Sequence, residues 1–300
     1  MSLLVVGTLA YDTIETPAGR VEEVLGGAAT YFSVAASFFC DVRLVGVVGE
    51  DFRTEDRSLL EGRGIDLTGL LVAPGASFRW SGSYLEDLNV AETRATHLNV
   101  LEGYEPRLPE EYRDAPFVFL ANAPPALQAL VLDQVNKGAF VAADTMNLWI
   151  DTAREELLEI LRRVDLLVCN DQEAVSISGQ DNLIRAGRAL LELGPRYAIV
   201  KKGEHGAMLF GKDLDYAVPA YPVPEVVDPT GAGDSFAGGV MGSLSGAGAV
   251  TGNELRRAII RGSVVASFTV EAFSLGRLAG LTREEIDRRI ETFLSYFAQP

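Results

Sequence analysis

The chain has 300 residues, of which 48% are hydrophobic, so it can bury a sizeable core in one large domain or two smaller ones. Its 42 Asp and Glu residues against 26 Lys and Arg give a net charge of −16. This balance argues against binding to duplex DNA, RNA or an anionic lipid surface, because such binding relies on cationic side chains. Backbone N–H groups can still hold a phosphate in an acidic protein.

Short β-branched runs alternate with amphipathic stretches along the chain. The pattern predicts strands over residues 3–7, 42–49, 117–122, 140–147, 165–170 and 197–203. It predicts helices over residues 27–39, 125–138, 154–164 and 182–194, and a C-terminal helix capped by Thr282 with Glu285 at the third helical position. This alternation indicates βαβ units. We therefore expect an α/β fold whose parallel sheet is covered on both faces and binds ligands at the carboxyl ends of its strands.

Residues 76–102 interrupt this rhythm, because polar and apolar residues alternate there without a helical stripe. They read as antiparallel strands with one solvated face. Together with residues 12–20 they form either a small β lid that projects from the main domain or an edge hairpin of the main sheet.

The N-terminus and the two cysteines indicate where the protein works. Residues 1–12, MSLLVVGTLAYD, have no basic segment before a short apolar run, and the longer apolar stretches are interrupted by proline or polar residues. We therefore expect no signal peptide and no transmembrane helix. Cys40 and Cys169 are far apart and beside apolar runs, which is typical of reduced core cysteines. A soluble cytoplasmic protein without membrane contacts is expected.

The most unusual stretch is DPTGAGDSFAGG, residues 228–239, in which four glycines surround Asp234. It predicts a strand, a glycine turn and a helix N-terminus, where outward N–H groups and the helix dipole form an anion hole. A carboxylate at such a hole repels a resting phosphate, but a general base that deprotonates a hydroxyl during phosphoryl transfer belongs there. The alternative is a left-handed turn with Asp234 as N-cap, which leaves the repeated small residues unexplained.

Two other phosphate-binding motifs are absent from the sequence. No G-x-x-x-x-G-K-[ST] occurs, and no G-x-G-x-x-G follows the first predicted strand. A P-loop enzyme and a nicotinamide-dependent dehydrogenase are therefore disfavoured.

Residues 228–239 closely resemble the second signature of the ribokinase-like (PfkB) carbohydrate kinases, D-T-x-G-A-G-D before a small-residue helix. Weaker resemblances follow the family's order along the chain, at GTLAYD (7–12), the glycine pair 26–27, NDQE (170–173) and KKGEHGA (201–207). The resemblance implies one ribokinase-like domain over residues 1–300, with a mostly parallel central sheet flanked by helices and a small β lid built from about 12–20 and 76–102.

The resemblance also implies roles for individual residues. Asp234 is the expected base, and Gly231, Ala232 and Gly233 supply the N–H groups of the anion hole. Asn170 and Glu173 organise Mg²⁺ through water. Lys201, Gly203 and Gly206 lie beside the nucleotide, and Asp12, Gly26 and Gly27 beside the acceptor. Asp228 and Thr230, with the loop 272–276, form a monovalent-cation site for K⁺.

Two acceptor-side positions depart from the family's sugar kinases. Tyr31 stands at or near the place of an asparagine, and Asn122 stands where ribokinases carry an acid that contacts the sugar. An aromatic face suits stacking on a ring, and an amide donates as well as accepts hydrogen bonds. We therefore expect an acceptor such as a nucleoside or a cyclic polyol ahead of a free pentose.

The expected activity is transfer of the γ-phosphoryl group of ATP, with Mg²⁺, to a hydroxyl of a small sugar, polyol or nucleoside. Two alternatives remain at this point: a catalytically silent nucleotide- or sugar-binding regulator of the same fold, and a nucleotide-dependent enzyme of another type, such as an ATP-hydrolysing dehydratase. The expected partners are these small molecules alone, with no nucleic acid and no membrane. The protein is expected to be a monomer or a homodimer joined through its lids.

Overall fold

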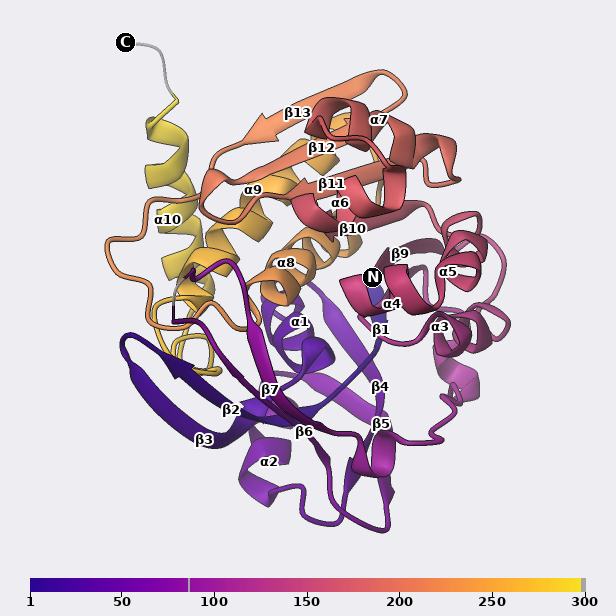
Figure 1. The fold of residues 1–300 in the computed structure, drawn as a ribbon, viewed down its shortest axis with the longest axis vertical. Helices are drawn as coiled ribbons and strands as arrows, with labels where there is room; N and C mark the ends of the chain where they lie inside the picture. The colour runs from indigo at the N-terminus through magenta and orange to yellow at the C-terminus, as the bar shows by residue number, and fades with distance from the viewer. Residues whose placement is uncertain (86, 298–300) are drawn as a thin grey trace.

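The structure is a computed structural model that describes residues 1–85 and 87–297. Glu86, inside the expected lid segment, and residues 298–300 lie outside the described residues. Two sheets and the helices around the larger one make up the described part of the chain (Figure 1).

The larger sheet has nine strands in the order β13-β12-β11-β10-β9-β8-β1-β4-β5. Neighbours are parallel except at one edge, where β11, β12 and β13 pair antiparallel. The mostly parallel sheet expected from the sequence is therefore confirmed. Its strands are β1 (Ser2–Val6), β4 (Asp41–Gly49), β5 (Ile65–Ala73), β8 (Phe117–Leu120), β9 (Phe140–Asp144), β10 (Leu166–Asn170), β11 (Tyr197–Lys201), β12 (Ala207–Gly211) and β13 (Leu214–Val218).

Successive strand residues point to opposite faces of this sheet, and each face has its own core. On β1, Leu3 and Val5 enter one core, whereas Leu4 and Val6 enter the other. The first core is covered by α1 (Ala28–Ala36), α8 (Ala232–Ala247), α9 (Gly252–Thr269) and α10 (Arg283–Ser295). The second is covered by α3 (Pro125–Leu132), α5 (Arg154–Leu161), α6 (Asp171–Ser178) and α7 (Leu183–Glu192).

The smaller sheet has the order β3-β2-β6-β7 and lies at the lower left of Figure 1. Its strands are β2 (Ala10–Thr16), β3 (Gly19–Gly26), β6 (Phe78–Ser83) and β7 (Glu92–His97). The alternative of an edge hairpin on the main sheet is therefore wrong. The N-terminal part is longer than the expected 12–20, and β2 joins β6 in parallel, whereas β2–β3 and β6–β7 are antiparallel.

Several predicted elements end earlier than the sequence pattern suggests, among them a strand and a helix whose ends are marked by hydrogen bonds. The strand expected over 140–147 ends at Asp144, where the N–H of Thr145 turns to the Asp144 carboxylate at 2.8 Å, and α4 (Asn147–Thr152) follows. The helix expected over 125–138 ends at Leu132, and the N–H of Asn136 bonds instead to the Arg113 carbonyl at 2.8 Å. The capping box of Thr282 and Glu285 is formed as predicted.

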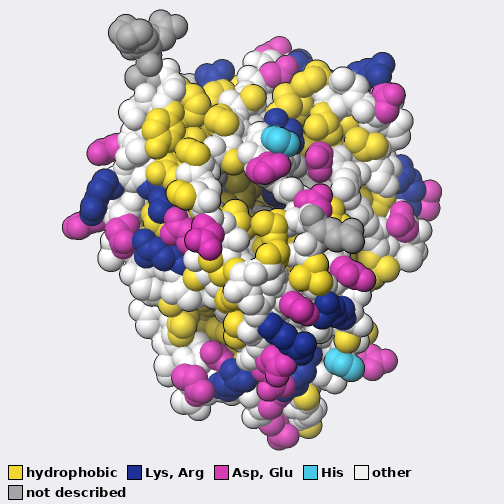
Figure 2. All heavy atoms as spheres, turned by 60° about the vertical axis from the view of Figure 1, so that its left-hand side comes forward, with side chains coloured by type: hydrophobic (Ala, Val, Ile, Leu, Met, Phe, Trp, Pro, Cys, Tyr) yellow, Lys and Arg dark blue, Asp and Glu magenta, His cyan; other side chains and the backbone are white. Residues whose placement is uncertain are grey.

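The surface is mixed in charge on the face turned forward in Figure 2, where acidic and basic side chains are interspersed around a hollow in the upper half. Within the described ranges, no helix has the length and apolarity needed to span a membrane. The remaining helix, α2 (Thr54–Gly62), packs beside β5.

Candidate active site

The glycine turn of residues 228–233 leads directly into α8, as the sequence predicts, but the strand expected before this turn is wrong, because residues 219–231 form no strand. Gly231 is the N-cap in a left-handed conformation with φ 73°, and a Cβ there would come within 2.3 Å of the Tyr31 ring. The Ala232 N–H donates to the Pro229 carbonyl at 3.1 Å. The Ala232 N–H is therefore already hydrogen-bonded within the turn. N–H groups in the first turn of a helix lack intrahelical acceptors, so the expected anion hole is left with the N–H groups around Gly231 and Gly233.

Asp234 lies in the first turn of α8, beside those N–H groups. Burial, together with the nearby Asp144 carboxylate, raises the pKa of its carboxyl group to about 7 against the opposing effect of the Lys201 ammonium. A base that is half ionised near neutral pH suits proton abstraction from a hydroxyl.

Three parallel strands bring their carboxyl ends to the same place. β9 ends at Asp144, β10 at Asn170 and β11 at Lys201, and β10 lies between the other two. The Lys201 side chain crosses the end of β10, so that its Nζ lies 3.3 Å from Asp144 Oδ2. The same Nζ would be 3.1 Å from a Cβ on Gly233, which places the ammonium against the first turn of α8.

The charge of this lysine is strongly favoured by its surroundings. Burial alone lowers the pKa of Lys201, but the carboxylates of Asp144, Glu173 and Asp234 raise it well above its ordinary value. Sequence reasoning placed Lys201 near the nucleotide but missed Asp144, which no motif marks.

Asn170 and Glu173 form a capping box at the start of α6. Asn170 Oδ1 accepts the Glu173 N–H at 2.8 Å, and Glu173 Oε2 accepts the Asn170 N–H at 2.7 Å. Burial and the Asp144 carboxylate together raise the pKa of Glu173 to about 7, although the Lys201 ammonium opposes the rise. The described residues contain no cluster of three or more His, Cys, Asp or Glu able to enclose a metal. The side-chain oxygens of Asn170 and Glu173 alone suit Mg²⁺, because this ion keeps several waters and takes few protein ligands.

Asp12 and the glycine pair, which the sequence predicts beside the acceptor, lie against each other. Asp12 is buried in β2, and burial raises the pKa of its carboxyl group to about 7. A Cβ on Gly26 would lie 1.9 Å from Asp12 Oδ2, and one on Gly27, which has φ 92°, would lie 2.6 Å from the Thr8 carbonyl oxygen. A side chain at either position would therefore clash with these neighbouring atoms, so both positions require glycine.

Of the two positions that depart from the sugar kinases, Tyr31 is placed differently from expectation. Tyr31 is only 1% exposed, and its ring packs on Gly231, so it offers no face for stacking on a ligand. The expected aromatic platform is thus corrected to a core residue that shapes the glycine turn. Asn122 follows β8, and its Oδ1 accepts the indole N–H of Trp149, a residue of α4, at 2.9 Å.

The residues proposed for a monovalent cation are brought together. Asp228 is fully buried; its Oδ1 accepts the Thr230 N–H at 2.9 Å and its Oδ2 accepts the Ser274 N–H at 3.2 Å. Ser274 adopts the left-handed φ of 54°, so the loop 272–276 is held against the glycine turn by this carboxylate.

The turn after β11 also requires its glycines. Gly206 has φ 85°, and a Cβ there would lie 2.1 Å from the Val218 carbonyl oxygen. Gly203 has φ 52°, and a Cβ there would lie 2.1 Å from Oδ1 of Asn89, in the loop between β6 and β7. The smaller sheet thus reaches across to the expected nucleotide turn.

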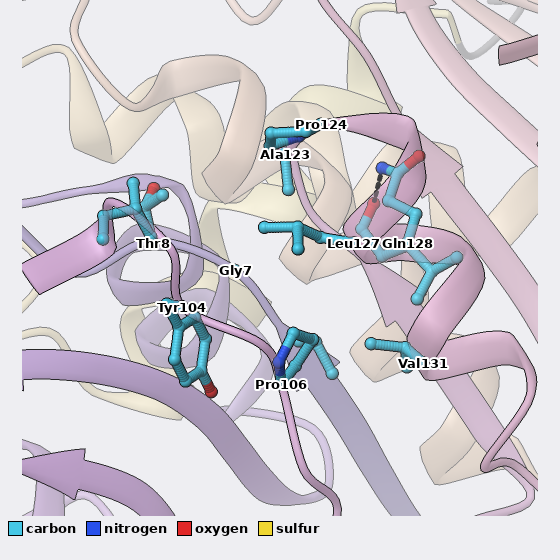
Figure 3. A pocket seen from close by; sticks show the side chains of 12 residues that line it. Gly7, Thr8, Tyr104, Pro106, Ala123, Pro124, Leu127, Gln128 and Val131 are labelled. Atoms are coloured by element: carbon cyan, nitrogen blue, oxygen red, sulfur yellow. Dashed lines mark hydrogen bonds between the residues drawn. The ribbon is translucent and has the colours of Figure 1, made fainter. Parts of the chain in front are cut away.

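A narrow apolar cavity of about 30 Å³ lies beside the acceptor side (Figure 3). Tyr104 and Pro106 face Leu127 and Val131 across it. It borders the glycine pair at Thr8, whose Oγ1 accepts the Ala28 N–H at 3.2 Å. Small-molecule sites usually span about 300 Å³ or more, so this cavity alone holds no acceptor.

Comparison with known proteins agrees with this geometry. The sequence profile described as pfkB family carbohydrate kinase matches residues 2–278. A cytidine kinase of Thermococcus kodakarensis is 32% identical over 82% of this chain and 89% of its own length. An inositol 3-kinase of Arabidopsis thaliana is 28% identical over 96% of this chain and 80% of its own.

The fold itself is shared with solved structures. A putative ribokinase II from E. coli, in complex with ATP and Mg²⁺, superposes with a TM-score of 0.80 at 19% identity and covers 97% of this chain and 99% of that one. The chain has a ribokinase fold and belongs to the pfkB family of carbohydrate kinases, as a sugar or nucleoside kinase.

Proposed function

We propose that this protein transfers the γ-phosphoryl group of ATP to a hydroxyl of a nucleoside, with a cyclic polyol as the second candidate acceptor. The observation that carries the proposal is the meeting of Asp234, the glycine turn and Lys201 at the N-terminus of α8. The names of the cytidine kinase and inositol 3-kinase relatives support both acceptor classes.

In the proposed transfer, one bond to the γ-phosphorus forms and one breaks. Asp234 takes the proton of the acceptor hydroxyl, and the hydroxyl oxygen forms a bond to the γ-phosphorus. The bond from that phosphorus to the β–γ bridging oxygen breaks, so ADP leaves. N–H groups around Gly231 and Gly233 and the Lys201 ammonium face the charge on the phosphoryl oxygens. Mg²⁺, organised through Asn170 and Glu173, supplies charge neutralisation at the phosphates when bound.

The acceptor side supports a ligand with a diol edge. Asp12 is a buried carboxylate beside a glycine pair, which suits the two hydroxyls of a ribose or an inositol. Because the Tyr31 ring is buried, selectivity for a base or polyol ring falls to other residues. Asn122, fixed by Trp149, and the apolar walls around Tyr104 are the side chains available near this end of the sheet.

The test is a comparison of kcat/KM for cytidine, adenosine, myo-inositol, ribose and fructose, at fixed ATP and Mg²⁺ and with K⁺ present or absent. We expect cytidine or another nucleoside to lead and Asp234→Asn to abolish most turnover. A clear preference for ribose or fructose would overturn the acceptor assignment. Nucleotide and acceptor binding without any turnover would overturn the catalytic assignment.

A further inference from the structure

The Lys201 ammonium is held at one position by the residues around it, although lysine is a flexible side chain. Its side chain is 18% exposed and runs from the end of β11 across β10 to Asp144 on β9. The ammonium stops 3.3 Å from Asp144 Oδ2 and beside Gly233, where even a single added carbon would lie 3.1 Å away. Lysine is a mobile point charge on a four-carbon chain, so such a position depends on its partner.

Asp144 is itself held firmly. Its Oδ1 accepts the Thr145 N–H at 2.8 Å, which orients the carboxylate at the point where β9 ends. Its backbone carbonyl accepts Nε2 of the buried Gln128 at 3.1 Å, and the same amide group donates to the Ala121 carbonyl at 3.2 Å. Gln128 therefore fixes the ends of β8 and β9 relative to each other.

Stability alone is a weak reason for this buried ion pair. Desolvating two charges costs as much as or more than their attraction returns, and apolar residues of similar volume often stabilise better. The pair is also expensive locally, because Asp144 disfavours ionisation of both Asp234 and Glu173. The ammonium and the N-terminus of α8 bring positive charge to one place, which is consistent with an anion that arrives during function.

We propose that Asp144 is a positioning residue, which holds the Lys201 ammonium beside Gly233 so that the ammonium contacts the γ-phosphoryl group of bound ATP. This proposal rests on the phosphoryl transfer proposed above and adds a defined role for each member of the pair. Lys201 touches the transferred group, whereas Asp144 acts only through Lys201. A purely structural pair would instead tie β9 to β11 and be indifferent to the γ-phosphate.

The experiment compares two nucleotides that differ at the γ-position. Dissociation constants of Mg²⁺-ADP and of the non-hydrolysable Mg²⁺-AMP-PNP are measured by calorimetry for the wild type, Lys201→Met and Asp144→Asn. A charge-assisted contact to one phosphate predicts that Lys201→Met weakens AMP-PNP binding by roughly tenfold or more and ADP binding by less than about threefold. Asp144→Asn keeps the shape of the side chain and should show the same selectivity at smaller size.

Two further variants separate positioning from folding. The first is the double variant Lys201→Met with Asp144→Asn. Because Asp144 acts through Lys201, this double variant should discriminate between the two nucleotides about as poorly as Lys201→Met alone. Lys201→Arg retains the charge and should recover part of the AMP-PNP affinity. Additive effects of the two single changes, or equal losses for ADP and AMP-PNP, would overturn the proposal.

A matched control lies at the opposite ends of the same strands. Asp165 precedes β10 and pairs with Arg196, which precedes β11, at 3.4 Å, and it also accepts the Val141 N–H at 3.0 Å. Asp165→Asn should change thermal stability without altering the ratio of the two dissociation constants. These binding measurements need no acceptor, so a wild type that discriminates the nucleotides but phosphorylates nothing would refute the proposed function and leave the lysine assignment standing.

Discussion

Asp234 combines the position of a helix N-terminal acid with a raised proton affinity. Replacement by Asn keeps the shape of the side chain but removes the base, so turnover should fall by roughly 10²-fold or more. ATP affinity should stay within a few fold of the wild type, because the glycine turn is unchanged. Steady-state kinetics with calorimetric nucleotide titration provide the measurement. An Asn variant that turns over at nearly the wild-type rate would remove Asp234 from the role of base.

The same residue predicts the pH dependence of catalysis. Burial and nearby charge raise the pKa of Asp234 to about 7, and Asp12 is also raised to about 7 by burial. In the roles proposed for them, both carboxylates act in the ionised form, so kcat/KM should fall as the pH drops through 7 and level off above 8. Because the two groups interact, the limb reports macroscopic values and should be steeper than a single ionisation. A flat profile between pH 5.5 and 8.5 would contradict this assignment.

Stability should respond in the opposite direction. A carboxyl group whose pKa is raised in the folded state binds protons that the unfolded chain releases, so its contribution to stability falls as pH rises from about 4 to 7. Asp234→Asn removes that penalty. We expect the melting temperature of the variant to match the wild type near pH 4 and to exceed it by a margin that grows with pH up to pH 8. Differential scanning calorimetry at both pH values checks the sign; a variant that is less stable at pH 8 contradicts it.

At the scale of elements, the glycine turn that leads into α8 can be tested through Gly233. An Ala Cβ there would lie 3.1 Å from Lys201 Nζ, which is tighter than ordinary contact, and Gly233 has no positive φ that would strain the backbone. The lysine can swing away, so Gly233→Ala should cost little stability but lower kcat by roughly tenfold or more, as misplaced catalytic groups do.

Gly62→Ala in α2 is the matched control, because nothing lies within 4 Å of the added carbon. Its kinetics should equal those of the wild type. If Gly233→Ala lost stability and activity in proportion, the glycine would serve the turn alone and not the placement of the ammonium.

The elements also explain what the sequence could and could not predict. Continuous apolar strands between helices predicted the sheet, and the density of glycine around Asp234 predicted the turn, because both are local patterns. The sequence pattern does not single out Asp144, because it predicts a strand to residue 147, whereas the strand ends at Asp144 itself. Lys201, with which Asp144 forms an ion pair, lies two strands away in the sheet, and no local sequence pattern indicates such a pairing. Tyr31 was misplaced for the same reason, since its burial depends on Gly231, far along the chain.

At the scale of the whole molecule, the smaller sheet contacts both the glycine turn before α8 and the turn after β11. β2 carries Asp12, and the Thr16 hydroxyl at its end donates to the Val227 carbonyl at 2.7 Å, just before the glycine turn. At the other side, Asn89 lies against Gly203. We therefore predict that the smaller sheet closes over the proposed acceptor and nucleotide positions and excludes the water that would otherwise compete for the phosphoryl group.

The last prediction concerns that closure and is measured by hydrogen exchange. Amides of β6 and β7 should exchange more slowly when acceptor and AMP-PNP are bound together than with either alone, because only the pair presents contacts to both ends of the sheet. α7, which covers the opposite side of the main sheet, serves as the internal control and should not change. Light scattering at the same concentrations separates closure from pairing of two lids, since β3 and β7 are the outer strands of the sheet. Equal protection in all four ligand states would show that the smaller sheet is a static wall of the site, and the exclusion of water would then have to come from the glycine turn and the loop 272–276.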